Sequence, residues 1–240
     1  MIARGAKIAD SIARAIVGDV AGSNLPVGSV LESESEMMKR YGVSRGSLRE
    51  ALRILEILGF IQIRSGPRGG PVLLDPNSRQ FSTIASLYYQ RINAKYLELL
   101  EMRLILEPQA AAWAAERRTE AHVEILRRYL GETRDSDLAD DREFRAVGQG
   151  FHDLISEMSG NPILNLVIRS CYDLFAGRTT GFLYPKKERH CVADIHEQIA
   201  KAIINSNSKK ARDLMRAHMD DYLSHAGKHF SGLMSEVVKW

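Results

Sequence analysis

The chain has 240 residues, of which 45% are hydrophobic and 26% charged, so it can form one large globular domain or two smaller ones. Its formal net charge of only +3 excludes a globally basic protein, and a surface that binds nucleic acid must come from local clustering of Lys and Arg. Two cysteines exclude a disulfide framework, and no apolar run is as long as a membrane span, so we expect a soluble, cytoplasmic protein.

Hydrophobic periodicity predicts three helices in the N-terminal part of the chain. The first spans residues 7–22. Its expected apolar face consists of Ile8, Ile12, Ala15, Ile16 and Val20. The second is a short helix that begins at a capping box, in which Ser33 is followed three residues later by Glu36, and that ends at Gly42.

The third predicted helix spans about 45–58, between an N-cap at Ser44 and a stop at Gly59. Residues 60–63 and 71–74 then read as two short strands, joined by the turn RSGPRGG. Two strands joined by a turn rich in glycine and charge form a β-hairpin. The order of elements is therefore three helices followed by a hairpin.

From residue 77 onward the sequence predicts helices alone. The expected segments are 77–91, 94–117, 119–130, 140–159, 161–177, 188–205 and 208–230. Seven helices of this length make an all-α domain. The predicted fold is therefore mainly α, with a winged helix-turn-helix over residues 1–76 and an all-α helical bundle over residues 77–240.

The third helix carries a basic ridge beside an apolar one, because Arg45, Arg49 and Arg53 recur every four residues between leucines. In a helix-turn-helix the N-terminal end of this helix enters the major groove, where arginine can bind guanine and phosphate. The alternative is an ordinary amphipathic helix with solvated arginines, which is the reading we keep open for Arg53. The candidate DNA-binding residues are Ser44, Arg45, Gly46, Ser47 and Arg49 on the helix and Arg64, Gly66, Arg68 and Gly69 on the hairpin.

The string LESESEMMKRYGVSRGSLREALRILEILGFI resembles the winged-helix signature of GntR-family bacterial transcription regulators. This resemblance implies that Arg45, Arg49, their neighbours and the glycine of the wing contact operator DNA. Members of the family often carry an arginine at the position between Glu34 and Glu36, where this chain has Ser35. The resemblance thus implies that one phosphate contact is missing here.

The stretches LLEMRLILEPQAAAWAAERR, FHDLISEMSGNPIL, DIHEQIAKAII and ARDLMRAHMDDYL, in this order, resemble the FCD effector domain of the FadR subfamily. Three histidines fall within predicted helices, at His152, His196 and His218, and imidazole is a usual ligand of divalent zinc or nickel. For a single histidine the alternative is a buried, hydrogen-bonded side chain. Three in this register favour a divalent metal as a cofactor.

Metal-binding domains of this type have an aspartate four residues before the first of these histidines, and this chain has Gly148 there. Gln149 can offer an amide oxygen as a weak fourth ligand, or else water or the carboxylate of an effector takes that place. Arg103, on a strongly apolar helix, is either paired with Glu107 or anchors a carboxylate effector. Arg145, two turns before His152, either lines the same cavity or lies at the surface.

These patterns predict a transcription regulator that binds a pseudo-palindromic operator in double-stranded DNA as a homodimer and responds to a small carboxylate metabolite. The family resemblance implies that it is a repressor. The first alternative is a metal-dependent hydrolase that uses the three histidines, although the chain has no HExxH or GxSxG motif. The second is an architectural DNA-binding protein without an effector. We expect no enzymatic activity.

Overall fold

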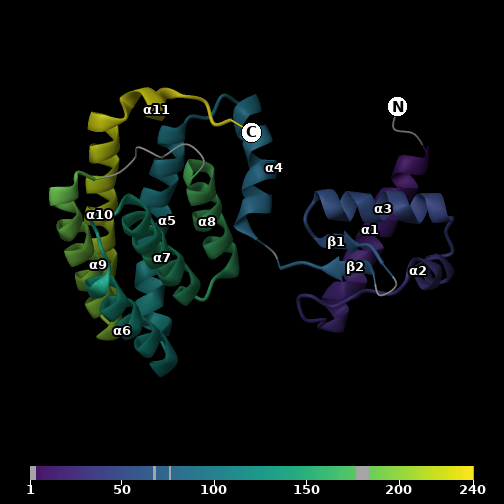
Figure 1. The fold of residues 1–240 in the computed structure, drawn as a ribbon, viewed down its shortest axis with the longest axis horizontal. Helices are drawn as coiled ribbons and strands as arrows, with labels where there is room; N and C mark the ends of the chain where they lie inside the picture. Colours follow the sequence, from purple (N-terminus) through teal and green to yellow (C-terminus); the bar gives the residue numbers. More distant parts are fainter. Residues whose placement is uncertain (1–3, 67–68, 76, 177–183, 240) are drawn as a thin grey trace. The chain divides into compact units, whose positions relative to one another are not determined.

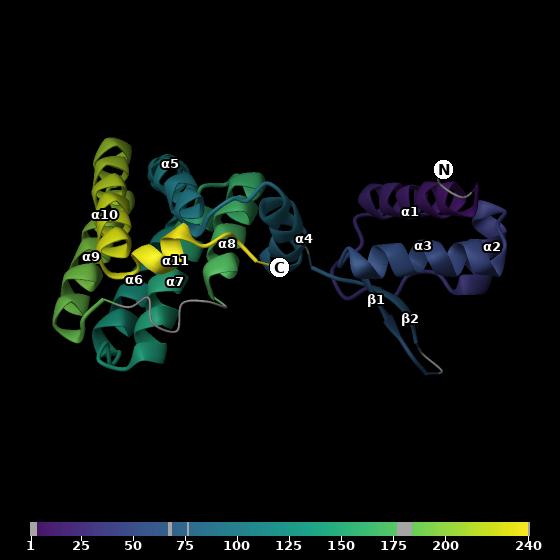
Figure 2. The ribbon, with the colours of Figure 1, turned by 90° about the horizontal axis from the view of Figure 1, so that it is seen from above.

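The computed structural model describes residues 4–66, 69–75, 77–176 and 184–239. The chain divides into two units, Met1–Gln80 and Phe81–Trp240, which are described separately (Figures 1 and 2). The sequence places the domain boundary between residues 76 and 77, a few residues earlier and just before α4 (Ser78–Arg91). None of the helices in the described part of the chain is both long and apolar enough to cross a membrane.

The first unit contains α1 (Arg4–Ser23), α2 (Glu34–Tyr41) and α3 (Arg45–Ile57). The predicted capping box is present at the start of α2, where Ser33 and Glu36 satisfy each other's backbone N–H groups. Gly42 ends α2 with φ of 63°, a left-handed conformation that turns the chain sharply into α3. These local signals fix the angle between the two helices of the helix-turn-helix.

The apolar ridge of α3 packs against α1 and α2 in one core. Its buried members are Ala9, Ile12, Ala13, Ile16, Met37, Leu48, Ala51, Leu52, Leu55 and Ile61. The sequence prediction for α1 was partly wrong, because Ile8 is 43% exposed and Ala15 is exposed, while Ala9 and Ala13 are buried. Small side chains at Ala9 and Ala13 let α3 approach α1 closely, and this close packing sets the buried face rather than the bulk of Ile8.

The hairpin consists of β1 (Ile61–Arg64) and β2 (Gly70–Leu73), which pair antiparallel with Ile61 opposite Leu73. Each strand is shifted by one residue from its predicted position. Sequence reasoning missed a further pairing, in which Val30 forms a bridge with Val72 and the N–H of Leu31 donates to the oxygen of Pro71 at 2.8 Å. This pairing ties the segment before α2 to the hairpin.

The second unit is helical, as predicted (Figure 1). After α4 it contains α5 (Tyr96–Arg117), α6 (Glu120–Asp135), α7 (Asp141–Met158), α8 (Pro162–Ala176), α9 (Arg189–Ile204), α10 (Ser208–His229) and α11 (Ser231–Ser235). A short 3₁₀ turn, η1 (Lys186–Glu188), precedes α9. The helix predicted at 119–130 runs about one turn further, because its apolar face continues to the buried Thr133. The sequence did not predict α11.

Helix α5 lies at the centre of this unit and contacts α7, α8, α9, α10 and α11. A run of alanines, Ala110–Ala115 apart from Trp113, is fully buried and lets neighbouring helices approach α5 closely. The main core joins this run to side chains of α7, α9 and α10, among them Phe151, Ile199 and Met215. Polar side chains on these four helices that point inward are consequently held in a rigid, dry environment.

The end of the described chain is attached to the start of α5. Lys95 and Val237 form an antiparallel bridge, and the N–H of Val238 donates to the oxygen of Ala94 at 2.8 Å. The Val238 side chain is fully buried, next to Tyr96. The sequence prediction of helices alone after residue 77 missed this pairing.

Gly42→Ala is expected to destabilise the first unit by about 1 kcal/mol, because an L side chain in the left-handed conformation brings Cβ too close to the backbone. Amide hydrogen exchange in α2 and α3 should accelerate accordingly. Gly131→Ala is the control, since Gly131 lies within α6 with open space around a new Cβ, and it should slow exchange in α6. Equal exchange in α2 and α3 of Gly42→Ala and the native chain would contradict the assigned turn.

Candidate functional site

The first unit brings the expected DNA-reading residues to the N-terminal end of α3. The hydroxyl of Ser44, the N-cap, accepts a hydrogen bond from the backbone N–H of Ser47 at 3.3 Å. Arg45 and Gly46 follow in the first turn and are exposed, whereas Leu48 is buried in the core. Backbone N–H groups and a cation at the start of a helix attract phosphate. This end of α3 therefore has the chemistry that a DNA backbone requires.

Arg49, one turn further along α3, is paired with α2. Its Nε lies 3.0 Å from Oε2 and 3.3 Å from Oε1 of Glu34, and its side chain remains 64% exposed. The sequence pattern did not indicate this ion pair, because the partners lie on different helices. Ser35 is exposed, and its Oγ lies 3.0 Å from Oγ of Ser33. The carboxylate of Glu34 thus orients Arg49 while leaving its outer edge accessible.

The hairpin carries the remaining DNA-binding candidates. Arg64 is exposed at the end of β1, and Gly66 has φ of 109°, which favours glycine. A Cβ on Gly69 would lie 2.2 Å from the backbone oxygen of Arg64, so glycine alone fits at this turn. Arg68 lies outside the described residues. The described part of the hairpin turn therefore contains two positions that favour glycine, Gly66 and Gly69, and follows one exposed basic side chain, Arg64.

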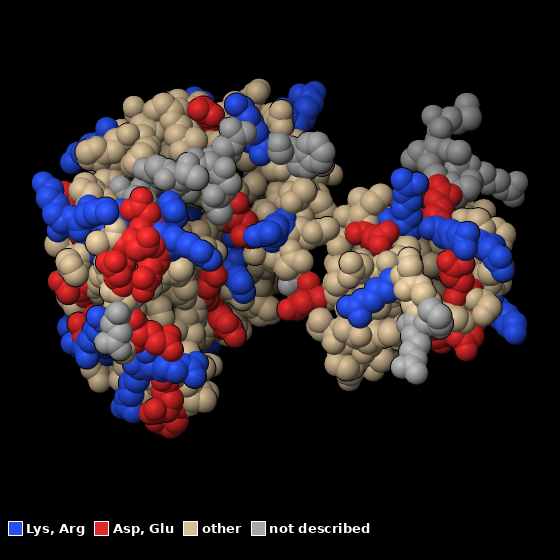
Figure 3. Space-filling model, in the orientation of Figure 1, with Lys and Arg blue, Asp and Glu red and all other residues tan. Residues whose placement is uncertain are grey.

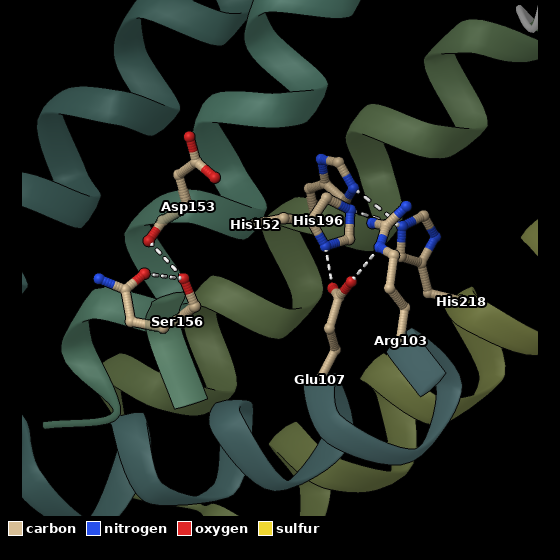
Figure 4. Close-up of polar contacts among 8 residues, drawn as sticks. Arg103, Glu107, His152, Asp153, Ser156, His196 and His218 are labelled. Atoms are coloured by element: carbon tan, nitrogen blue, oxygen red, sulfur yellow. Dashed lines mark hydrogen bonds and ion pairs between the residues drawn. The ribbon is translucent and has the colours of Figure 1, made fainter. Parts of the chain in front are cut away.

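Three histidines from three helices of the second unit converge on one point (Figure 4). His152 of α7, His196 of α9 and His218 of α10 are all buried. Nε2 of His218 lies 3.1 Å from Nε2 of His196 and 3.3 Å from Nε2 of His152. Among the described residues, this is the group of His, Cys, Asp and Glu side chains that is able to hold a metal ion.

The two separations that involve Nε2 of His218 fit a coordination sphere. Two ligands bonded to one zinc ion at about 2.1 Å lie roughly 3.0 Å apart at a right angle and roughly 3.4 Å apart at the tetrahedral angle. The two measured separations, 3.1 and 3.3 Å, fall within this interval. The donor set of three imidazoles suits zinc, nickel or another borderline divalent ion. The residues present therefore fit a metal ion.

Burial favours the neutral form of His196 and His218, which is the form that binds metal. It lowers the pKa of His196 well below its ordinary value, and the neighbouring histidines add to this effect. Burial, together with His152, lowers the pKa of His218 to about 3. The ring of His196 also stacks on the ring of Phe151, with centroids 4.1 Å apart, which fixes its orientation. The site is thus ready to offer lone pairs at neutral pH.

Glu107 of α5 orients the first histidine. One oxygen of its carboxylate accepts a hydrogen bond from Nδ1 of His152, so the lone pair of a neutral His152 lies on Nε2, which faces the other two histidines. The other oxygen lies 2.6 Å from Nε of Arg103. Sequence reasoning missed the contact with His152, which joins residues far apart in the chain. The i, i+4 spacing did indicate the pair with Arg103.

Arg103 and Glu107 form a buried ion pair, which was one of the two sequence-based readings of Arg103. Burial alone would raise the pKa of Glu107, but Arg103 and His152 outweigh it and lower that pKa to about 2. The guanidinium carbon of Arg103 also lies 5.3 Å from the ring centroid of Tyr172 and 5.5 Å from that of Tyr222. These contacts hold Arg103 charged in the core.

A cavity of about 60 Å³ adjoins the histidines, with room for a few water-sized groups. Its wall contains Arg103, Phe144, Arg145, Gly148, His152, Tyr172, Tyr184, Val192, His196, His218 and Tyr222. Arg103 therefore lies on the cavity wall although it is paired with Glu107. Arg145 also lies on this wall rather than only at the surface. Gln149 is not among the described residues that line this cavity, whereas Gly148 is.

A second pocket, of about 410 Å³, shares three wall residues with this cavity, namely Tyr184, Val192 and His218. The hydroxyl of Tyr184 is hydrogen-bonded to Asp221 at 3.0 Å. The Tyr184 ring stacks on His225, with centroids 4.2 Å apart. Space next to the histidines therefore extends beyond the small cavity, past Tyr184 and along α9 and α10.

Charge on the surface is mixed. On the face drawn in Figure 3, Lys and Arg side chains are interspersed with Asp and Glu side chains over both units. This agrees with the net charge of +3 and means that a basic surface must be local. Arg45, Arg49 and Arg64, which are candidates for such a surface, are all exposed.

Two family models match the chain. The model of the bacterial regulatory proteins of the gntR family matches residues 8–68, and the model of the FCD domain matches residues 98–221. The chain belongs to the GntR family. Its second unit carries the FCD domain, and this GntR protein is accordingly a transcription regulator with an N-terminal helix-turn-helix.

Curated relatives have names of the same kind. The chain is 32% identical to an HTH-type transcriptional regulator of Mycobacterium tuberculosis over 173 residues, 72% of this chain and 68% of that protein. It is 29% identical to the HTH-type transcriptional regulator LutR of Bacillus subtilis, covering 85% of this chain and 96% of LutR. It is 28% identical to the transcriptional repressor NanR of Citrobacter rodentium, covering 82% and 75% respectively. These relatives are regulators.

A solved structure of similar fold is that of Streptococcus agalactiae GntR. It aligns over 90% of this chain and 99% of that chain with a TM-score of 0.68 and 22% sequence identity. At this identity the similarity shows the fold alone. The predicted winged helix-turn-helix followed by an FCD-type helical bundle is therefore confirmed.

Glu107→Leu is expected to destabilise the second unit by about 3–5 kcal/mol, because it leaves Arg103 charged, buried and without its partner. The double variant Arg103→Met, Glu107→Leu should recover much of this loss. Urea unfolding followed by tryptophan fluorescence measures the effect, since Trp113 and Trp240 both belong to the second unit. A double variant less stable than Glu107→Leu would contradict the dominance of the unpaired charge.

Proposed function

We propose that this protein is a repressor that binds operator DNA through α3 and the hairpin, and that a small carboxylate metabolite bound in the FCD domain controls this binding. The observation that carries the proposal is the convergence of three buried histidines and two arginines, Arg103 and Arg145, on one cavity. A divalent metal ion held by the histidines would supply a positive centre for the carboxylate. A relative of this chain, NanR, is named a transcriptional repressor, and this name supports the repressing role.

The DNA-binding part of the proposal rests on the N-terminal end of α3. The exposed side chain of Arg45 is suited to the two acceptors of guanine in the major groove. Arg49, oriented by Glu34, is suited to an adjacent base or phosphate. Arg64, Gly66, Arg68 and Gly69 would follow the backbone beside the groove. Arg53 is exposed two turns further along α3 and serves as a phosphate contact at most.

One winged helix reads only a short half-site, and specific affinity requires a larger interface. We therefore propose a homodimer on a pseudo-palindromic operator, in which each α3 occupies one half-site. The effector would act by binding more tightly to one relative placement of the two DNA-binding units. Only such a difference in affinity can shift the equilibrium between DNA-binding and released forms.

The roles of the two arginines differ. Arg103 is fixed by Glu107 and two tyrosine rings, so it offers its remaining N–H groups from a rigid position. Arg145 lies on α7, two turns before His152, and contributes a second positive charge to the wall. A hydrolase would need an acid or base beside the metal, and the carboxylate that is hydrogen-bonded to His152, Glu107, is also paired with Arg103. This arrangement supports binding rather than turnover.

Arg45→Ala is expected to weaken operator binding by about 1–3 kcal/mol and to relax sequence preference at one base pair of each half-site. The measurement is fluorescence anisotropy with an operator from the region upstream of the gene, at fixed salt, against a panel of single-base variants. Arg14→Ala is the control, because Arg14 is an exposed arginine on α1 that is paired with Asp10. Unchanged affinity in both Arg45→Ala and Arg49→Ala would overturn the assignment of α3.

Full-length protein loaded with Zn²⁺ and then desalted is expected to retain about one metal ion per chain, because the ligand atoms of three imidazoles all lie within 4.8 Å of one another. The double variant His196→Ala, His218→Ala should retain none. His190→Ala is the matched control, since this histidine is exposed at the start of α9. Metal content is measured by plasma mass spectrometry, and equal content in the double variant and the control would reject the site.

A further inference from the structure

A pocket of about 300 Å³ lies in the first unit, between the C-terminal half of α1, the segment that precedes α2 and α2 itself. Its apolar wall consists of Ile16, Val20, Leu25, Val30, Leu31 and Met37. Leu25 is 41% exposed and Val30 is 54% exposed, so large apolar side chains face solvent at this pocket. A pocket of this volume with mostly apolar walls and a few polar groups is typical of small-molecule sites.

The polar groups of this pocket converge on Arg40. Its Nη1 lies 2.6 Å from Oε1 of Glu32, and its Nη2 lies 3.1 Å from Oδ2 of Asp19. The hydroxyl of Tyr41 donates a hydrogen bond to the same oxygen of Asp19 at 2.7 Å. The pocket wall thus contains two carboxylates and one guanidinium, which leave one negative charge uncompensated.

Tyr41 adds an aromatic ring to this polar wall. Burial, together with the hydrogen bond to Asp19, raises the pKa of Tyr41 to about 12, so its hydroxyl stays protonated and donates at neutral pH. The guanidinium carbon of Arg40 lies 5.9 Å from the centroid of the Tyr41 ring. Aromatic rings and carboxylates both attract cationic groups, and the pocket combines them with apolar walls.

The charge of the wall favours a cationic ligand over an anionic one. An anion would have to compete with two carboxylates for the guanidinium of Arg40. A cation would instead meet the second oxygen of each carboxylate. The side chains of Asp19 and Glu32 are 42% and 43% exposed, so these oxygens are within reach of a ligand in the pocket.

We propose that this pocket binds a small organic cation, whose ammonium or guanidinium group lies at Asp19 and Glu32 and whose apolar body contacts the apolar wall. The inference goes beyond the proposed function, because the site lies in the first unit and uses no residue of the FCD domain. Tyr41 is the last residue of α2 and directly precedes the turn at Gly42. A ligand in this pocket would therefore contact the first helix of the helix-turn-helix.

The test uses full-length protein with labelled methyl groups on Ile, Leu and Met, titrated with phenethylamine and followed by NMR. Methyl shifts of Ile16, Leu25 and Met37 report on the pocket, and those of Ile199 and Met215, in the core of the second unit, are the reference. Phenethyl alcohol and hydrocinnamate have a similar aromatic body and are the neutral and anionic comparators. The amine is expected to bind about fivefold more tightly than the alcohol, and the anion more weakly than the alcohol, as partly exposed charges predict.

Variants of the polar wall test the assigned charges. Asp19→Asn and Glu32→Gln each remove a negative charge and should lower the affinity for the amine toward that for the alcohol. Arg40→Gln removes the positive charge and should tighten binding of the amine about threefold. Asp10→Asn is the matched control, because Asp10 is an exposed aspartate of α1 that is paired with Arg14 and does not line the pocket. Its affinity for the amine should equal that of the wild type.

The comparison of the three compounds uses the wild type and does not depend on the folding of any variant. Absence of saturable methyl shifts at Ile16, Leu25 and Met37 with the amine would overturn the site. Equal affinity for the amine, the alcohol and the anion would overturn the preference for cations. Unchanged binding of the amine by both Asp19→Asn and Glu32→Gln would overturn the assigned carboxylates.

Discussion

The arrangement of the second unit depends on one buried carboxylate. Glu107 contacts Arg103 on its own helix and His152 on α7, so this one side chain both pairs with the buried guanidinium and orients a histidine. Charges are tolerated at this depth only when their hydrogen bonds are satisfied, and two tyrosine rings complete the enclosure of Arg103. The pair lies on α5, the helix that contacts α7, α8, α9, α10 and α11.

The first unit also contains an ion pair that orients an arginine, and this pair lies at its surface. Glu34 pairs with Arg49 across the helix-turn-helix, but both groups remain partly exposed, so the pair costs little and stabilises little. The pair matters because it orders the side chain of Arg49, and a side chain that is already ordered loses less conformational entropy when it binds a partner. The buried pair of Arg103 and Glu107 keeps the interior of the second unit rigid. The exposed pair of Arg49 and Glu34 keeps Arg49 accessible at the surface of the first unit.

Local signals explain why much of the fold could be predicted. The capping box at Ser33, the N-cap at Ser44 and the turn at Gly42 are written in neighbouring residues and appear as expected. The convergence of the three histidines was expected from the resemblance to the FCD domain rather than from a local signal. What the sequence did not indicate were contacts between distant segments, such as Glu107 with His152 and Val30 with Val72. Such pairings are set by tertiary packing, which no local pattern encodes.

The bridge between Lys95 and Val237 closes nearly the whole second unit into a ring. Contacts between residues so far apart in sequence contribute to a high contact order and carry a large entropic cost of closure. We therefore expect this bridge to form late in folding and to open early in partial unfolding, while the core around α5 persists.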